Sequence, residues 1–239
     1  MATIGQRVGA LVAVAALAGC GQPAQGDAPV VFAASSLSTV LPHLDDTARF
    51  SFDGSTGLLD QLRSGAQADV FVSADHDTML AAAEEGLLDG EPVMVATNRL
   101  VLVVPADNPA SVTGFDGSLA DTRLVVCAPE VPCGSGARRL AEAAGVRLDP
   151  VSEELKVTDV LGKVASGEAD AGIVYATDAA LASDAVTAME IPGAAADPNT
   201  YWAGVVAQAP HPEGAEAFVA ALAGPWQADL RAAGFGPPR

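Results

Sequence analysis

Short apolar runs alternate with segments of helical periodicity along most of the chain. The first run covers residues 30–34 and is followed by Leu37, Leu41 and Leu44, where Pro42 is expected to shorten the helix. Further buried strands are expected at 50–52, 68–74, 100–104, 124–127 and 172–175. Strands that alternate with helices in this way predict an α/β fold built on mainly parallel sheets.

Capping residues mark where several of the helices should begin. Asp75 or Asp77 is expected to cap one helix, and Thr158 with Asp159 is expected to cap a helix over 160–166. Later helices are expected at 134–144, 213–222 and 226–233. The strand-helix units fall into two groups, which predicts two lobes with a ligand cleft between them. The approximate division is 30–102 plus 203–239 for lobe 1, and 103–202 for lobe 2.

The N-terminus has the pattern of a bacterial export signal. Arg7 precedes an uncharged apolar stretch of about eleven residues, which is too short to span a bilayer. The stretch ends in Leu-Ala-Gly-Cys at 17–20, which resembles a lipobox. Residues 1–19 are therefore expected to be a signal peptide, and Cys20 the lipidated first residue of a flexible tether at 20–29. This predicts a body outside the cytoplasm that the membrane holds only through lipid.

Charge excludes one class of partner. The chain carries 30 acidic and 12 basic residues, a formal net charge of -18, which argues against nucleic-acid binding. Aromatic residues make up only 5% of the chain, so the core should consist mainly of Ala, Val and Leu. The three histidines have no metal-ligand spacing and are expected at the surface.

Two cysteines remain once Cys20 is lipidated. Cys127 and Cys133 enclose a seven-residue loop in an oxidising compartment, so they are expected to form a disulfide or else to stay as two unpaired thiols. A thiol at the start of a helix has a lowered pKa. An extracytoplasmic enzyme that uses Cys133 as its nucleophile is therefore an alternative.

Residues that are mostly small and uncharged gather where the predicted strands end and helices begin. They are Ser35, Ser36, Gly54, Ser55, Thr56, Pro132, Cys133, Gly134, Thr158, Asp159, Val160 and Tyr175. A helix N-terminus offers free N–H groups and about half a unit of positive charge. Four such ends together supply roughly two units, which suits a small dianion and needs no Lys or Arg.

Several of these segments resemble the periplasmic molybdate-binding proteins of ABC importers. The resemblance rests on VFAASSL at 31–37, FDGSTG at 52–57, ADVFVSAD at 68–75, EVPCG at 130–134 and GIVY at 172–175. It implies the two-lobed periplasmic-binding-protein fold of type II, with two crossover segments. It also implies an oxyanion held by the hydroxyl and N–H groups of Ser36 and Ser55, the N–H groups of Cys133 and Val160, and the Tyr175 hydroxyl. The family usually has Ala where this chain has Cys133, and a backbone contact tolerates that exchange.

The resemblance further implies a monomeric receptor, without enzymatic activity or cofactor, that passes its ligand to the permease of an ABC importer. The ligand would be molybdate and also tungstate, bound through oxygen with no direct metal ligation. A receptor for another tetrahedral dianion such as sulfate remains an alternative, because the sequence does not show the pocket radius.

Overall fold

The computed structural model describes residue 2 and residues 28–239, so the predicted signal peptide, apart from residue 2, and Cys20 lie outside the described residues. Its strands are β1 (Val30–Ala34), β2 (Arg49–Asp53), β3 (Val70–Ser73), β4 (Leu88–Asn98), β5 (Leu100–Pro105), β6 (Leu124–Cys127), β7 (Ser152–Glu154), β8 (Ala171–Tyr175), β9 (Val186–Glu190) and β10 (Asn199–Val206). Its α-helices are α1 (Leu41–Leu44), α2 (Ser55–Arg63), α3 (His76–Glu84), α4 (Pro132–Ala144), α5 (Val157–Ala165), α6 (Ala176–Leu181), α7 (Pro212–Ala223) and α8 (Gln227–Ala232). Short 3-10 helices cover Ser35–Leu37 and Gly117–Leu119.

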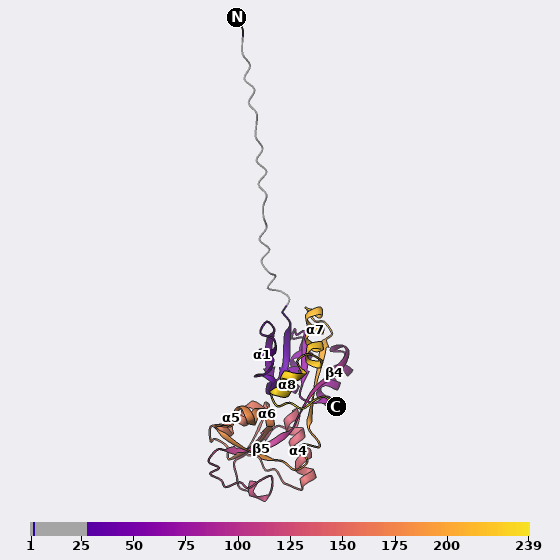
Figure 1. Cartoon of the computed structure of the whole chain (residues 1–239). Coiled ribbons are helices and arrows are strands. Elements are labelled where there is room, and N and C mark those ends of the chain that lie inside the picture. The colour runs from indigo at the N-terminus through magenta and orange to yellow at the C-terminus, as the bar shows by residue number, and fades with distance from the viewer. Residues whose placement is uncertain (1, 3–27) are drawn as a thin grey trace.

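The strands form two five-stranded sheets with the same plan. The first has the order β2-β1-β3-β10-β4 and the second the order β7-β6-β8-β5-β9. In each sheet the fourth strand, β10 or β5, runs antiparallel to both of its neighbours, while the first three strands pair in parallel. Four of the five strands in each sheet thus share one direction. The expected two-lobed α/β fold with mainly parallel sheets is confirmed (Figure 1).

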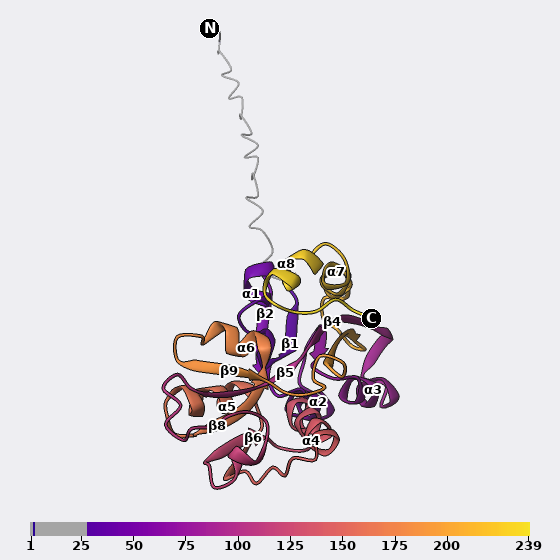
Figure 2. The ribbon, with the colours of Figure 1, turned by 60° about the horizontal axis from the view of Figure 1, so that its bottom comes forward.

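The chain crosses between the sheets twice. β4 ends at Asn98 and β5 begins at Leu100, and the return runs from the end of β9 at Glu190 to the start of β10 at Asn199. We call the first sheet with its helices lobe 1 and the second sheet with its helices lobe 2. The boundaries expected from the sequence fall inside β5 and β10, so the sheets change a few residues earlier than these estimates. Figure 2 shows the two lobes side by side, with the C-terminal helices α7 and α8 on lobe 1.

Of the two helix caps expected from the sequence, one is confirmed and the other is not. Asp75 caps α3 and accepts a hydrogen bond from the Thr78 N–H at 3.1 Å. The helix expected at 160–166 begins three residues earlier, at Val157, with Lys156 as its N-cap. The Lys156 carbonyl accepts from the N–H of Asp159 at 3.2 Å, which closes the first turn ahead of the expected cap. Asp159 therefore lies in the first turn, where a carboxylate favours the positive end of the helix.

One hydrophobic core runs through both lobes. The largest buried cluster includes the central strands β1 and β3 of lobe 1 together with β5, β6 and β8 of lobe 2. A smaller cluster lies where α2 and α3 pack against the first sheet, around Phe71 and Met79. Because this hydrophobic core is continuous, the strand ends of the two sheets are held next to one another. No helix in residues 28–239 combines the length and apolar character that a bilayer crossing requires.

Candidate functional site

A small cavity lies where the two lobes meet, at the ends of strands from both sheets. Its lining comprises Ala34, Ser35, Ser36, Asp53, Gly54, Ser55, Ala74, Val131, Pro132, Cys133, Leu155, Lys156, Val157 and Tyr175. The cavity is small, about 20 Å³. It has room for one small group rather than for an extended ligand.

Ser55 is positioned to donate into this cavity. It is the first residue of α2, is almost fully buried, and its Oγ accepts a hydrogen bond from the Ala74 N–H at 3.0 Å. Because a hydroxyl has one hydrogen and two lone pairs, this contact leaves the hydrogen free to donate. The first N–H groups of α2 have no partner within the helix. Ser55 thus brings a hydroxyl and a backbone donor to the same edge.

Ser36 has a comparable arrangement with a different partner. It lies in the 3-10 helix after β1 and is buried, and its Oγ is 2.7 Å from the Tyr201 Oη. When Tyr201 donates in this pair, the Ser36 hydrogen is free for a ligand. Tyr201 comes from β10, the strand that returns from lobe 2. No sequence signal marks Tyr201 as a site residue, because its apolar strand context is typical of a core residue.

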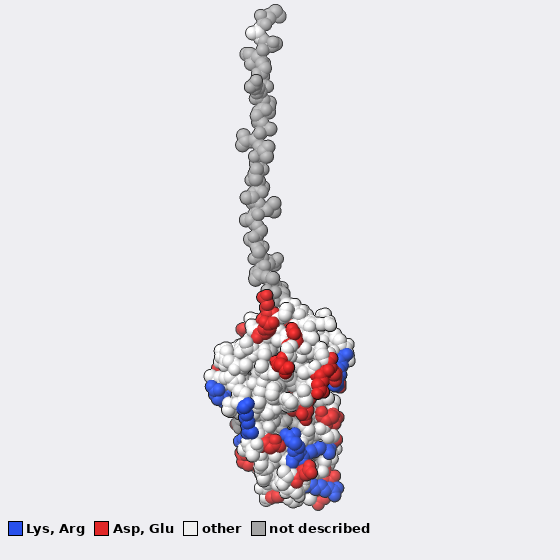
Figure 3. Space-filling view, turned by 90° about the vertical axis from the view of Figure 1, so that its right-hand side faces the viewer, with Lys and Arg blue, Asp and Glu red and all other residues white. Residues whose placement is uncertain are grey.

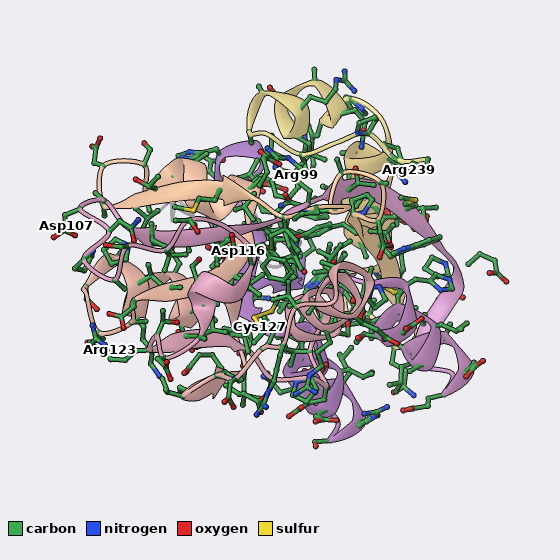
Figure 4. The ribbon with its side chains drawn as sticks, turned by 90° about the horizontal axis from the view of Figure 1, so that it is seen from below. Arg99, Asp107, Asp116, Arg123, Cys127 and Arg239 are labelled. Atoms are coloured by element: carbon green, nitrogen blue, oxygen red, sulfur yellow. A yellow bond between two sulfur atoms is a disulfide. The ribbon has the colours of Figure 1, made fainter. Side chains whose placement is uncertain are left out.

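Cys133 is the first residue of α4 that can donate a backbone N–H, since Pro132 has none. The structure joins it to Cys127 at the end of β6 by a disulfide, with Cα atoms 5.6 Å apart. The first of the two sequence alternatives, a bonded pair, is therefore confirmed. Figure 4 shows the Cys127 sulfur near the middle of the molecule, while Asp107 and Arg123 lie at the outer edge of lobe 2. A bonded Cys133 offers no thiolate, so the enzyme alternative lacks its nucleophile.

Val160 is not part of the cavity lining, and Val157 takes its place. The side chain of Val160 is fully buried in lobe 2, and its N–H faces the Lys156 carbonyl at 3.5 Å. Val157 is the first residue of α5, so its N–H has no acceptor within the helix. The difference follows directly from the earlier helix start. Val157 thus lines the cavity in the position where Val160 was expected.

Tyr175 brings a phenol to the cavity from the end of β8. The residue is 1% exposed, and its Oη has no hydrogen-bond partner among the described residues. Burial raises the pKa of Tyr175 well above its usual value of 10, so the group stays a neutral donor. A buried hydroxyl without a partner is costly unless something else accepts its hydrogen bond. An anion in the cavity would satisfy it.

Asn199, at the start of β10, bridges the two lobes beside the cavity. Its Nδ2 donates to the Ala74 carbonyl at 3.3 Å and to the Pro132 carbonyl at 2.9 Å. Gly136 of α4 gives it room, because a Cβ there would lie 2.6 Å from the Asn199 Oδ1. The sequence does not mark Asn199 as a site residue, since a single Asn before a strand belongs to no motif.

Two charged side chains line the cavity, those of Asp53 and Lys156, and each has a partner within the protein. The Asp53 Oδ1 accepts from the Gly54 N–H at 2.8 Å, and the Lys156 Nζ lies 3.7 Å from the Asp159 carboxylate. The positive character comes from the N-termini of α2, α4 and α5, each worth about half a unit. In residues 28–239 no cluster of His, Cys, Asp or Glu has the arrangement of a metal site. The site is thus suited to an anion bound through N–H and O–H donors.

A two-lobed α/β body with a donor-lined cavity between the lobes is the architecture of a solute receptor. A family model described as bacterial extracellular solute-binding protein matches residues 26–236, and the chain belongs to this family.

Among curated proteins, the chain is similar to the molybdate-binding protein ModA of Mycobacterium tuberculosis, with 42% identity over 227 residues and 87% of each chain covered. It is 33% identical to ModA of Haemophilus influenzae over 200 residues, covering 74% of this chain and 77% of that one. Among solved structures, the Azotobacter vinelandii periplasmic molybdate-binding protein has a TM-score of 0.75 at 23% identity, with 88% and 100% coverage. The sulfate-binding protein SubI of M. tuberculosis has a TM-score of 0.67 at 18% identity, with 88% and 86% coverage, and shares the fold.

Proposed function

We propose that this chain is a receptor that captures molybdate, and tungstate as well, and delivers it to an ABC importer without enzymatic activity. The observation that carries the proposal is the small cavity lined by Ser36, Ser55 and the Tyr175 hydroxyl, which has no partner among the described residues. The similarity to proteins named for molybdate binding supports molybdate over sulfate. We assign the ligand contacts to Ser36, Ser55, Cys133, Val157 and Tyr175.

Calorimetric titration tests the ligand. The chain without its first 20 residues is titrated with molybdate, tungstate and sulfate in parallel. We expect one-to-one binding of the first two and none of sulfate. Binding of sulfate alone would keep the oxyanion site and overturn the ligand, and no binding of any of the three would overturn the function.

Two substitutions test the site. Ser36→Ala and Ser55→Ala each remove a hydrogen bond to a charged ligand, worth about 1.5–3 kcal/mol, so affinity should fall roughly 10- to 150-fold. Ser166→Ala is the matched control, because Ser166 lies beyond the opposite end of α5 and donates only to the Lys163 carbonyl. Unchanged affinity in both cavity variants would overturn the site assignment.

The proposal includes a lipid anchor at Cys20 and a monomeric body. Incorporation of a labelled fatty acid should occur in the full chain and disappear in Cys20→Ala. Sedimentation of the soluble body should give the mass of one chain. On the face shown in Figure 3, Lys and Arg lie among Asp and Glu and do not form one basic patch, in line with a partner other than nucleic acid.

A further inference from the structure

At Gly54 and Leu155 the backbones of the two lobes lie so close together that there is no room for a side chain at position 54. Gly54 precedes α2 in lobe 1, and a Cβ placed on it would collide with the Leu155 backbone carbonyl oxygen of lobe 2 and lie 3.4 Å from the Leu155 carbonyl carbon. Leu155 directly precedes Lys156, the N-cap of α5. Gly54 and Leu155 both line the cavity. The contact is therefore part of the cavity wall, made from both lobes.

Nothing in lobe 1 itself requires glycine at this position. Gly54 has φ -61° and ψ 140°, a conformation that any residue adopts without strain. Apart from its neighbours in the chain, the three atoms nearest to such a Cβ all belong to lobe 2, namely two of the Leu155 backbone and one of Val131. Alanine at position 54 would thus fit the lobe and fail only when the lobes come together.

A second contact between the lobes lies two residues further along the chain. The Thr56 Oγ1 of α2 donates a hydrogen bond of 2.8 Å to the Glu130 carbonyl of lobe 2. Glu130 lies three residues before Cys133, whose N–H we assign to the ligand. The Thr56 hydrogen bond and the approach of Gly54 to Leu155 occur in the same arrangement of the two lobes.

We propose that Gly54 and Thr56 together set the closure of the two lobes: the missing side chain at 54 allows full approach, and the Thr56 hydroxyl holds it. This rests on the proposed function and adds positioning residues that do not touch the ligand through their side chains. Their effect is on the cavity radius, because a gap between the lobes admits water and moves the donors of lobe 2 away from those of lobe 1.

Gly54→Ala is the main test, and Gly57→Ala is its matched control. A Cβ at Gly57 has only ordinary contacts, the nearest at 3.6 Å to the Asp53 Oδ2. Overpacking of the kind expected at position 54 typically weakens a closed state by roughly 5- to 150-fold. We therefore expect Gly54→Ala to bind molybdate at least about fivefold more weakly, and Gly57→Ala to bind like the wild type.

Small-angle X-ray scattering separates closure from a local disturbance. The wild type and Gly57→Ala should give the same radius of gyration with saturating molybdate, and Gly54→Ala a larger one. Far-ultraviolet circular dichroism of Gly54→Ala without ligand should match that of the wild type, because alanine at position 54 fits lobe 1 itself. Equal affinity, or weaker binding with full contraction, would overturn the inference.

Thr56→Val gives an independent arm should Gly54→Ala fail to fold. It keeps the side-chain shape and removes the hydroxyl, so affinity should fall two- to tenfold, as for loss of one neutral hydrogen bond. Unchanged affinity would overturn the role of Thr56. If the wild type binds none of the oxyanions, the proposed function fails. The scattering comparison without ligand then still tests the contact, because Gly54→Ala should be the more open protein and equal radii would overturn the inference.

Discussion

Two buried aspartates, one far from the cavity and one beside it, show what an anion needs inside this protein. Asp69 precedes β3 and has a side chain that is 0% exposed. Its carboxylate accepts from the Val30 N–H at 2.7 Å and the His211 N–H at 2.6 Å, and it lies 3.1 Å from the His211 Nδ1. Asp178 of α6 is 4% exposed, and its Oδ2 has no partner among the described residues.

The two carboxyl groups respond to burial in opposite directions. Burial acts to raise the pKa of Asp69, but the hydrogen bonds from Val30 and His211 outweigh it and leave the pKa below 3.8. Burial raises the pKa of Asp178 to about 7, because one backbone hydrogen bond is too little to offset it. Backbone and side-chain donors thus decide whether a buried negative charge is stable. The cavity resembles the surroundings of Asp69, because its backbone and side-chain donors are already in place. The difference is that a ligand would supply the anion.

Removing the charge of Asp69 should have the largest effect on folding. The Asp69 carboxylate accepts hydrogen bonds from backbone N–H groups, and the amide of Asp69→Asn would place a donor against them. The free energy of unfolding should therefore fall by about 2–4 kcal/mol at pH 7. Because the folded pKa is lowered, the contribution of Asp69 is present above pH 3.8 and is lost as pH falls through the folded value. Urea unfolding at pH 7 and pH 3 measures both effects. A loss below 1 kcal/mol at pH 7 would contradict the interpretation.

Asp178 should show the reverse dependence on pH. Its folded pKa of about 7 lies above the ordinary 3.8, so its contribution is full below pH 3.8 and declines as pH rises through 7. Asp178→Asn does not titrate, so its stability relative to the wild type should improve by about 2 kcal/mol between pH 5 and pH 8. Comparing the two pH values cancels any fixed cost of the amide. A pH-independent difference would show that Asp178 is not held neutral.

His211→Ala sharpens the Asp69 side of the comparison with a smaller change. The substitution removes the ring contact at 3.1 Å and keeps the backbone N–H of position 211, so about 1 kcal/mol of stability should be lost. Urea unfolding checks the value. A loss as large as that of Asp69→Asn would place most of the stabilisation in the ring.

The sequence interpretation placed all three histidines at the surface, and for His211 this was wrong, because its side chain is 24% exposed and bonded to a buried carboxylate.

Local patterns predicted the parts of this protein that depend on local sequence. The strand runs and the capping Asp75 gave the α/β class, and the resemblance of the strand ends gave Ser36, Ser55, Cys133 and Tyr175 as lining residues. β4 was missed, because its first half, with Asp89, Gly90, Glu91 and Pro92, has no apolar alternation. What could not be predicted depends on partners distant in sequence. Asn199 acts through the Ala74 and Pro132 carbonyls, and the shift from Val160 to Val157 follows from the start of α5 at its N-cap Lys156.

Tyr175→Phe should have the smallest effect on folding and a clear effect on binding. The hydroxyl has no partner among the described residues, so its removal leaves no protein group unpaired, and the free energy of unfolding should change by less than about 0.5 kcal/mol. Affinity for molybdate should fall about tenfold or more, because the lost hydrogen bond is to a charged ligand. Tyr201→Phe is the matched control, since its hydroxyl bonds the Ser36 Oγ at 2.7 Å and its loss should lower stability even without ligand. Equal stability losses in the two variants would show that the Tyr175 hydroxyl is satisfied by the protein, and the cavity would then lack the unmet donor that distinguishes it from the Asp69 site.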